Sequence, residues 1–488
     1  MRRLRRPSNI ATALQPPCDE AVSLDDPSGS CVSETGTLVA TILGSSLAFV
    51  VGSIINVALP SMQADFDTDA AGVQWIVNAY LLPLSALVLA GGSLGDHYGR
   101  KRFFMIGLGL FTVATLACAL APNLETLLVL RFAQGVGAAM LAPNSLAIIA
   151  DGFSGEKRGQ AVGTWAAAGA VAGAAAPVIG GFVIDNLDWR WAFAIVIPPA
   201  GAAWLVGQRS IRESRESEDE RTPLDISGAV LATVSLAALV FALISLPERG
   251  WNDLTVIASA CAGALLGAAF FITEMRKGRG AMMPLGVFGS MSFSGISILT
   301  LLLYAALGGL MVLFPYMLIQ GLGYSATAAG AALLPFPLVM GVLSRRMGGL
   351  ATAIGIRRTL TIGPVLVAAG FAFFAMFPST ETNYWTALFP GLIVMAIGMA
   401  VCVAPLTTAV MNAVENRYVG VASGVNNAIS RIAGLIATAL LGFVLIGGAG
   451  GETDLIAGFK SAAWVGVGLA LASALASLAM IRESVVAD

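Results

Sequence analysis

Long apolar runs recur along the chain from about residue 37 to the carboxyl terminus, and short polar stretches separate them. Each run is long enough to cross the hydrocarbon core of a bilayer as a helix, which takes about 20 residues. We count fourteen, near residues 37–59, 72–94, 103–121, 125–149, 160–184, 191–207, 226–246, 253–273, 292–319, 326–345, 358–377, 385–411, 419–446 and 461–481. The pattern predicts an all-α integral membrane protein, and because fourteen is even, both termini lie on one side.

The polar stretches divide these runs into groups of six, two and six. The first 36 residues are polar, and no apolar stretch follows their basic start directly, so we expect a disordered tail rather than a cleavable signal peptide. The predicted units are a tail at 1–36, a six-helix bundle at 37–207, a linker at 208–224, two inserted helices at 225–273, a second linker at 274–291 and a second six-helix bundle at 292–488.

An internal repeat supports this division. The segment GSLGDHYGRKR at 92–102 aligns with GGLATAIGIRR at 348–358, and the dipeptide AlaPro at 142–143 recurs at 404–405. A third pair, QAVG and VASG, occurs at nearly the same offset. Two similar bundles in one membrane chain are typical of parallel-repeat transporters, in which the bundles enclose a cavity near the bilayer midplane.

Charge orients the chain. Only 11% of the residues are charged and 57% are hydrophobic, whereas a soluble chain carries about a quarter charged residues. Most of the 27 lysines and arginines fall in segments on the side of the amino terminus, and only Arg190, Arg249 and Lys460 fall on the opposite side. The positive-inside rule therefore predicts cytoplasmic termini, and the Ala- and Gly-rich spans favour a bacterial inner membrane as the location. The net charge of −2 gives no indication of nucleic-acid binding.

The sequence gives no sign of a metal centre, a cofactor or catalysis. Five cysteines are scattered and His97 is the one histidine, so zinc-ligand spacing is absent. The chain has no Walker A, HExxH or GxSxG motif. A membrane enzyme is therefore the least favoured class, and ATP is not expected as the direct energy source.

The densest polar pattern is the loop at 92–102, between the second and third runs. Two apolar helices joined so tightly must leave and re-enter the bilayer on one side. Its glycines permit close approach of the backbones, and Asp96 can accept hydrogen bonds from helix amides or pair with Arg100. The residues that carry the pattern are Gly92, Asp96, Gly99, Arg100 and Lys101.

These motifs resemble those of the major facilitator superfamily, specifically its fourteen-span drug:proton antiporter group. The loop matches the superfamily's motif between spans two and three, while Arg131, Gln134 and Gly135 match its span-four motif. Pro177, Gly180 and Gly181 match most of its span-five antiporter motif. The resemblance implies that Arg131 takes part in proton coupling. In the function we expect, the loop latches the two bundles in one of two conformational states, and the span-five glycines serve as a packing hinge or seal.

One departure concerns the mechanism. Members of this group usually carry an Asp in span one, five positions before the Asn of NVALP, where this chain has Val51. No Asp or Glu lies in the middle of any predicted span, although coupling requires a group that titrates. Three interpretations remain: coupling through a peripheral carboxylate such as Glu125, Asp185 or Asp225, uncoupled transport, or a coupling-defective variant.

The expected function is proton-coupled efflux of lipophilic drugs or toxic compounds by alternating access. The alternative is an uncoupled or differently coupled transporter for a metabolite or a lipid-like substrate. The expected partners are a small lipophilic substrate, protons and the bilayer, with the chain acting as a monomer.

Candidates for the substrate cavity are polar or amphipathic residues within apolar runs. Trp75 and Tyr316 could equally anchor the helices at the membrane interface, and Arg431 could extend its charge toward one face. The full set comprises Asn56, Gln74, Trp75, Asn78, Asn144, Trp165, Tyr304, Tyr316, Gln320, Asn426, Asn427 and Arg431.

Overall fold

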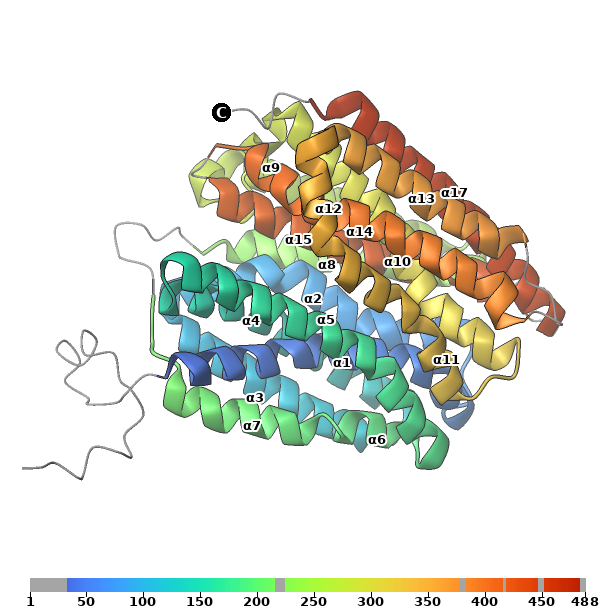
Figure 1. Cartoon of the computed structure of the whole chain (residues 1–488). Helices are drawn as coiled ribbons and strands as arrows, with labels where there is room; N and C mark the ends of the chain where they lie inside the picture. Colours follow the sequence, from blue (N-terminus) through green and yellow to red (C-terminus); the bar gives the residue numbers. More distant parts are fainter. Residues whose placement is uncertain (1–32, 216–223, 377–382, 416–417, 446–451, 483–488) are drawn as a thin grey trace, which may run out of the picture.

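A computed structural model of the chain describes residues 33–215, 224–376, 383–415, 418–445 and 452–482 (Figure 1). These residues form long helices and no strand, which confirms the all-α prediction. The first half of the chain, coloured blue to green, and the second half, coloured yellow to red, lie against each other in Figure 1.

The first half contains the six predicted segments. Its helices are α1 (Glu34–Asp65), α2 (Ala70–Tyr98), α3 (Arg100–Ala119), α4 (Leu124–Gly152), α5 (Gly155–Asn186), α6 (Trp189–Ala194) and α7 (Ile197–Ser210). The sixth segment is divided into α6 and α7 because two prolines follow Ile197, and proline is tolerated at the start of a helix but not inside it. Ser33 caps α1, its hydroxyl accepting from Gly36 N at 3.1 Å.

The two inserted helices form a hairpin of α8 (Ile226–Arg249) and α9 (Leu254–Lys277). They approach closely because a Cβ at Gly263 would lie 2.7 Å from the Leu239 side chain, and Ser235 Oγ donates to Gly263 O at 2.8 Å. Helix α8 packs against α2 of the first half and α15 of the second, whereas α9 packs mainly against α8. Two short 3₁₀ turns, Gly278–Gly280 and Leu285–Gly289, lead to the next helix.

The second half repeats the six-segment plan. Its helices are α10 (Met291–Gln320), α11 (Ala326–Leu333), α12 (Pro335–Ile354), α13 (Ile356–Met376), the π-helical turn η4 (Tyr384–Leu388), α14 (Phe389–Asn412), α15 (Val419–Ala439), α16 (Gly442–Leu445) and α17 (Glu452–Met480). Helices α11 and α12 form one predicted run that breaks at Leu334, before Pro335. Both halves use small residues for close packing: a Cβ at Gly91 would lie 2.5 Å from Ala139 O, and one at Gly398 would lie 2.7 Å from Gly363 O.

Among the described residues, thirteen helical segments are long and apolar enough to cross a membrane. The remaining predicted run contains α15, which has 21 residues but includes Asn426, Asn427 and Arg431 and does not reach that apolarity. The predicted unit boundaries at 1–36, 208–224 and 274–291 stay predictions. Most of the tail, residues 1–32, and residues 216–223 lie outside the described ranges.

We name the two ends of the bundle by their turns. The α2–α3 end carries the loop at 92–102, and the α1–α2 end carries the turn at 66–69. At the α1–α2 end the halves touch through backbone: a Cβ at Gly181 of α5 would lie 2.5 Å from the carbonyl carbon of Ala326, and one at Gly330 of α11 would lie 2.5 Å from that of Pro177. Toward the α2–α3 end, nothing lies within 4 Å of a Cβ at Gly159 or Gly163 of α5. The α5–α11 contact is therefore confined to one end.

Candidate functional site

The loop at 92–102 makes its described polar contacts within the first half. Asp96 Oδ1 accepts from Arg100 Nε at 2.7 Å, and Arg100 Nη1 lies 3.5 Å from Asp151 Oδ1 at the end of α4. Gly92 faces α4, where a Cβ would lie 3.3 Å from Pro143 Cβ. The predicted Asp96–Arg100 pairing is present, and it joins α2, α3 and α4.

Gly99 makes the turn between α2 and α3 possible. Its φ of +122° is one that side chains rarely adopt, and a Cβ there would lie 2.7 Å from Glu213 Oε1. The Glu213 carboxylate accepts from Lys101 N at 3.0 Å and Arg102 N at 3.1 Å, so a negative charge lies at the amino end of α3. Lys101 Nζ donates to Gln208 O at 2.9 Å. Sequence analysis did not identify Glu213, which is more than a hundred residues away in the chain.

Arg131 of α4 is 1% exposed, and its partners are neutral. Its Nε donates to Ile76 O at 3.1 Å, and Nη1 donates to Gln134 Oε1 at 2.7 Å. The guanidinium carbon lies 4.5 Å from the ring centroid of Tyr80, a cation–π contact. Gln134 Nε2 in turn donates to Thr115 Oγ1 of α3 at 2.7 Å. Among the described residues, no carboxylate forms a salt bridge with Arg131.

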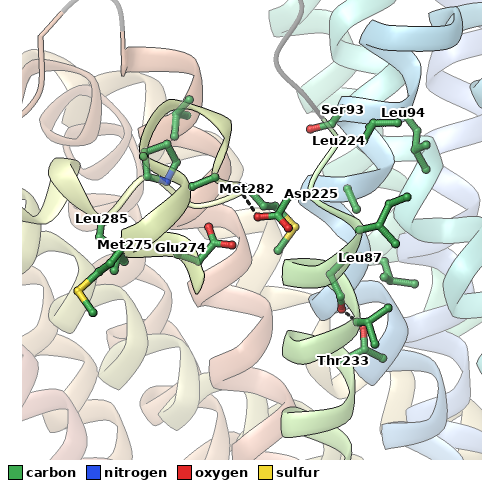
Figure 2. A pocket seen from close by; sticks show the side chains of 18 of the residues that line it. Leu87, Ser93, Leu94, Leu224, Asp225, Thr233, Glu274, Met275, Met282 and Leu285 are labelled. Carbon is green, nitrogen blue, oxygen red and sulfur yellow. Dashed lines mark hydrogen bonds between the residues drawn. The ribbon is translucent and has the colours of Figure 1, made fainter. Parts of the chain in front are cut away.

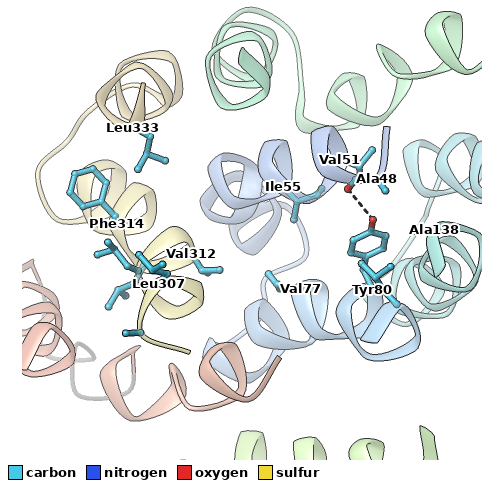
Figure 3. Packing of buried hydrophobic residues seen from close by; sticks show 14 of the residues in the cluster. Ala48, Val51, Ile55, Val77, Tyr80, Ala138, Leu307, Val312, Phe314 and Leu333 are labelled. Carbon is cyan, nitrogen blue, oxygen red and sulfur yellow. Dashed lines mark hydrogen bonds between the residues drawn. The ribbon is translucent and has the colours of Figure 1, made fainter. Parts of the chain in front are cut away.

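Tyr80 connects this network to span one. Its hydroxyl donates to Ala48 O at 2.9 Å, and Val51 lies three residues farther along α1, 1% exposed (Figure 3). Val51 is therefore buried near the Arg131 network, at the position where the group that the sequence resembles usually carries an Asp. Gly135 lets α2 and α4 approach, because a Cβ there would lie 2.6 Å from Pro83 Cγ.

Arg431 of α15 brings a second cation from the other half. Its guanidinium carbon lies 5.9 Å from the centroid of Phe49 of α1, and its buried Nε has no hydrogen-bond partner. Three further residues of the predicted cavity set also have unpartnered buried atoms: Asn78 at both its amide atoms, Gln74 at Oε1 and Asn144 at Oδ1. Unpartnered buried polar atoms are costly in a folded protein, so they are candidates for ligand contacts.

Most of the other predicted cavity residues join helices. Asn144 Nδ2 donates to Gly91 O at 3.0 Å and Trp165 Nε1 donates to Ser45 Oγ at 2.7 Å, while Tyr316 donates to Gln63. Trp75 packs against Phe241 of α8, with the ring centroids 6.3 Å apart.

The rest of the set occupies mixed positions. Thr300 Oγ1 donates to Asn426 Oδ1 at 2.8 Å. Asn56 and Tyr304 are half-buried, whereas Gln320 and Asn427 are exposed. Their participation in a substrate cavity stays a prediction.

The span-five residues lie at the contact between the halves. A Cβ at Gly180 would lie 2.6 Å from Ile54 Cγ2 of α1, and Gly181 and Pro177 face α11. One turn beyond them, Asp185 accepts from Ala326 N at 2.9 Å and Thr327 N at 2.8 Å, so it caps the amino terminus of α11 from the other half. Sequence analysis named Asp185 only as a peripheral carboxylate. The capping role depends on a contact between residues that are 141 positions apart in the sequence, which no local pattern predicts.

The start of α8 and the end of α9 carry a second charged cluster. Asp225 caps α8 by accepting from Gly228 N at 2.6 Å, and it forms a salt bridge with Lys277. Burial alone would raise the pKa of Asp225, but hydrogen bonds from Lys277, Glu274 and the backbone lower the pKa below its usual value. Among the described residues, this cluster included, no group of three His, Cys, Asp or Glu side chains could hold a metal ion.

The architecture so far is that of a helical membrane protein with a buried arginine, Arg131, in its first half and a second arginine, Arg431, that reaches α1 from the second half. The family model of the Major Facilitator Superfamily matches residues 41–438 and 296–487. The chain therefore belongs to the major facilitator superfamily, a family of transporters.

Relatives named for drug resistance are similar along most of the chain. The multidrug resistance protein Stp of Mycobacterium tuberculosis is 32% identical over 84% of this chain and 75% of its own length. The puromycin resistance protein pur8 of Streptomyces alboniger is 34% identical over 84% of this chain and 81% of its own. The tetracenomycin C resistance and export protein of Streptomyces glaucescens is 29% identical. These names agree with the expected class, a transporter that exports drugs.

Solved structures share the fold at low sequence identity. A peptide transporter, POT, in complex with sulfate superposes with a TM-score of 0.66 at 15% identity, covering 91% of this chain and 94% of the other. A bacterial homologue of the lysosomal transporter Spinster superposes with a TM-score of 0.63 at 16% identity, covering 92% and 97%. At these identities the likeness extends to the fold alone.

Proposed function

We propose that this protein is a secondary active exporter of lipophilic drugs or toxic compounds, working by alternating access. The observation that carries the proposal is the pair of cations, Arg131 and Arg431, that the two halves bring to the region around Phe49 and Tyr80. Charged side chains inside a membrane domain usually mark a substrate or ion pathway. The names of the drug-resistance relatives support the same function.

Alternating access would act on the two ends in turn. Here the α5–α11 contact joins the halves at the α1–α2 end, while the hydrogen bonds and salt bridges of the loop at 92–102 among the described residues lie within its own half. In the opposite state, the Gly181 and Gly330 contacts would break and the loop would contact the second half. Both termini would be cytoplasmic in a bacterial plasma membrane, so this structure would be open toward the cytoplasm. A monomer suffices, because one chain supplies both bundles.

We propose further that transport is proton-coupled and that Asp185 is the titrating group. Its carboxylate is exposed and joins the halves by accepting from two amides and the hydroxyl of Thr327. Protonation would remove the charge that favours the amino end of α11 and would weaken these bonds. Because these bonds stabilise the charged form, protonation of Asp185 and closure of the α1–α2 end oppose each other, and a low external pH would favour the open end.

Efflux of a lipophilic dye from cells expressing the chain, with and without a protonophore, tests this function. We expect efflux to stop when the protonophore is added, and Asp185→Asn to abolish the dependence on external pH. Asp188→Asn is the matched control, since Asp188 lies three residues away and bonds within the first half, to Arg190. Absence of efflux from a correctly inserted chain would refute drug export.

A second function is favoured by Val51 and by the neutral partners of Arg131: uncoupled transport of a metabolite or a lipid-like substrate. Efflux that persists in the presence of the protonophore would support it. A Val51→Asp variant separates the two, because it restores an acid near Tyr80. Protonophore-sensitive efflux only in that variant would show that the wild type is uncoupled.

A further inference from the structure

A large pocket lies where the α8–α9 hairpin meets both halves, away from Arg131. Its volume is about 1140 Å³, and it is bounded by α2, the start of α8, the end of α9, the segment at 278–286 and the start of α15 (Figure 2). Drug-sized ligand pockets range from about 300 to 1,000 Å³. The pocket therefore has room for a whole small molecule.

The walls of the pocket are apolar along most of their area. Leu87 of α2, Val230 and Val234 of α8 and Leu285 after α9 contribute aliphatic surface. The charged groups among the lining residues are Asp225 and Glu274, which lie together near one end of α8 and α9 (Figure 2). A ligand that matches this pocket is amphipathic, with one polar group and an apolar body.

Glu274 has an unused acceptor although it is 1% exposed. Its Oε2 accepts from Met283 N, whereas its buried Oε1 has no hydrogen-bond partner. A Cβ at Gly228 would lie 2.5 Å from Glu274 Oε1 and 2.8 Å from Asp225 Oδ2, so these two oxygens face the same small space. Two carboxylates that share a space require a proton or a cation between them.

The charge of the cluster is incomplete. Lys277 bonds to Asp225 Oδ1 and to Ser227 Oγ, and within the described part of the chain no hydrogen bond or salt bridge joins it to Glu274. A ligand ammonium can take the place of the proton that two such carboxylates otherwise share, and with both carboxylates ionised the two acids and the Lys277 ammonium leave one negative charge for it to complement. A lipid phosphate would be repelled there, whereas an N–H donor with a positive charge would complement both the charge and the free acceptor.

We propose that this pocket is a second ligand site, specific for a lipophilic molecule with one ammonium group, distinct from the region of Arg131 and Arg431. The ammonium donates to Glu274 Oε1 and Asp225 Oδ2, and the apolar body packs among Leu87, Val230 and Leu285. The site spans a boundary between the halves, because Val421 of α15 belongs to the second half and Leu87 to the first. An occupant would therefore contact two parts that alternating access moves apart.

Binding to the purified full-length protein in phosphatidylcholine nanodiscs tests the proposal. The probes are dansylcadaverine, a fluorescent lipophilic amine, and its uncharged N-acetyl derivative. We expect the wild type to prefer the amine, and Glu274→Gln to weaken amine binding by about tenfold or more without changing the affinity for the N-acetyl derivative, since a charged hydrogen bond is lost. Equal affinity for both probes, or an unchanged amine affinity in Glu274→Gln, would overturn the proposal.

A second variant tests the location of the site independently of the carboxylates. Val230→Trp places a large ring in the pocket and should weaken both probes. The control is Leu265→Trp, because Leu265 on α9 is 72% exposed and does not line the pocket. This variant should bind both probes as the wild type does. Displacement of the amine by phosphatidic acid would also contradict the proposal.

Discussion

Two buried charged regions of this protein neutralise charge in different ways. Arg131 is surrounded by a carbonyl oxygen, the amide of Gln134 and the ring of Tyr80, all neutral. The cluster at α8 and α9 instead contains two carboxylates and the ammonium of Lys277. A buried cation can thus be held by oriented dipoles alone, whereas neighbouring carboxylates require a counter-charge.

Because their charges differ, the two regions are expected to bind different ligand groups. The region around Arg131 and Arg431 carries positive charge that no described acid neutralises, so it suits carbonyl or anionic groups of a ligand. The cluster beside the pocket contains two neighbouring carboxylates and one ammonium, so it suits a further ammonium in place of a shared proton. The following variants are ordered from the largest expected effect to the smallest.

Replacing Arg131 should have the largest effect. Arg131→Leu leaves Gln134 Oε1 without its donor in a buried site, at a cost of about 1–3 kcal/mol, and it also removes the bond to Ile76 O of α2. We expect loss of dye efflux and a lower melting temperature, measured on membranes and on purified protein. Arg131→Lys should recover part of the stability, because it restores a cation without the two-donor geometry. Efflux at the wild-type rate in Arg131→Leu would show that transport does not require the charge of Arg131.

Replacing Lys277 should destabilise the charged cluster at α8 and α9, with a smaller effect than the replacement of Arg131. Lys277→Met leaves Asp225 and Glu274 without a cation, and breaking a largely buried pair costs about 3–5 kcal/mol before discounting for the partly exposed lysine. Because the Lys277 side chain is 34% exposed, we expect about 1–2 kcal/mol, measured by thermal unfolding. The double variant Lys277→Met/Asp225→Asn should recover most of that loss. Additive losses in the double variant would contradict a direct interaction.

The pKa of Asp225 predicts how its region responds to acid. Its pKa is lower in the folded state than the unfolded value of about 4, so its stabilising effect is complete above pH 4 and is lost as the pH falls. Asp225→Asn should therefore be less stable than the wild type at pH 6, and the difference should shrink as the pH drops below about 4. Thermal unfolding in detergent across this range measures it. A difference that does not vary with pH would refute the ionic role.

Thr115→Val should have the smallest effect. It removes the hydroxyl that accepts from Gln134 Nε2, at a cost of about 1 kcal/mol, and leaves both bonds of Arg131 in place. Thr112→Val is the matched control, since Thr112 Oγ1 lies on the same helix and donates only to Leu108 O. Equal melting temperatures for the two variants would show that Thr115 does not support Gln134.

The sequence was sufficient to predict the helices and the loop at 92–102, because apolar runs and a fixed spacing of charges are local signals. It also indicated that Arg131 is buried. It could not identify Tyr80, Thr115 or Glu213 as partners, since each meets its target across a helix interface. Polarity alone did not separate Asn144 and Trp165, which join helices, from residues such as Asn78, whose amide has no partner.

Helix α15 has a consequence for how the chain is made. It was not among the segments apolar enough to span alone, and an arginine at the centre of a helix raises the cost of insertion by about 2.5–3.5 kcal/mol. Its neighbours in the fold are α2 and α10, both synthesised earlier. We therefore expect α15 to enter the bilayer stably only after these helices are in place. Because the chain is synthesised from its amino terminus, α2 and α10 are available as partners for the polar side chains of α15 when it is made.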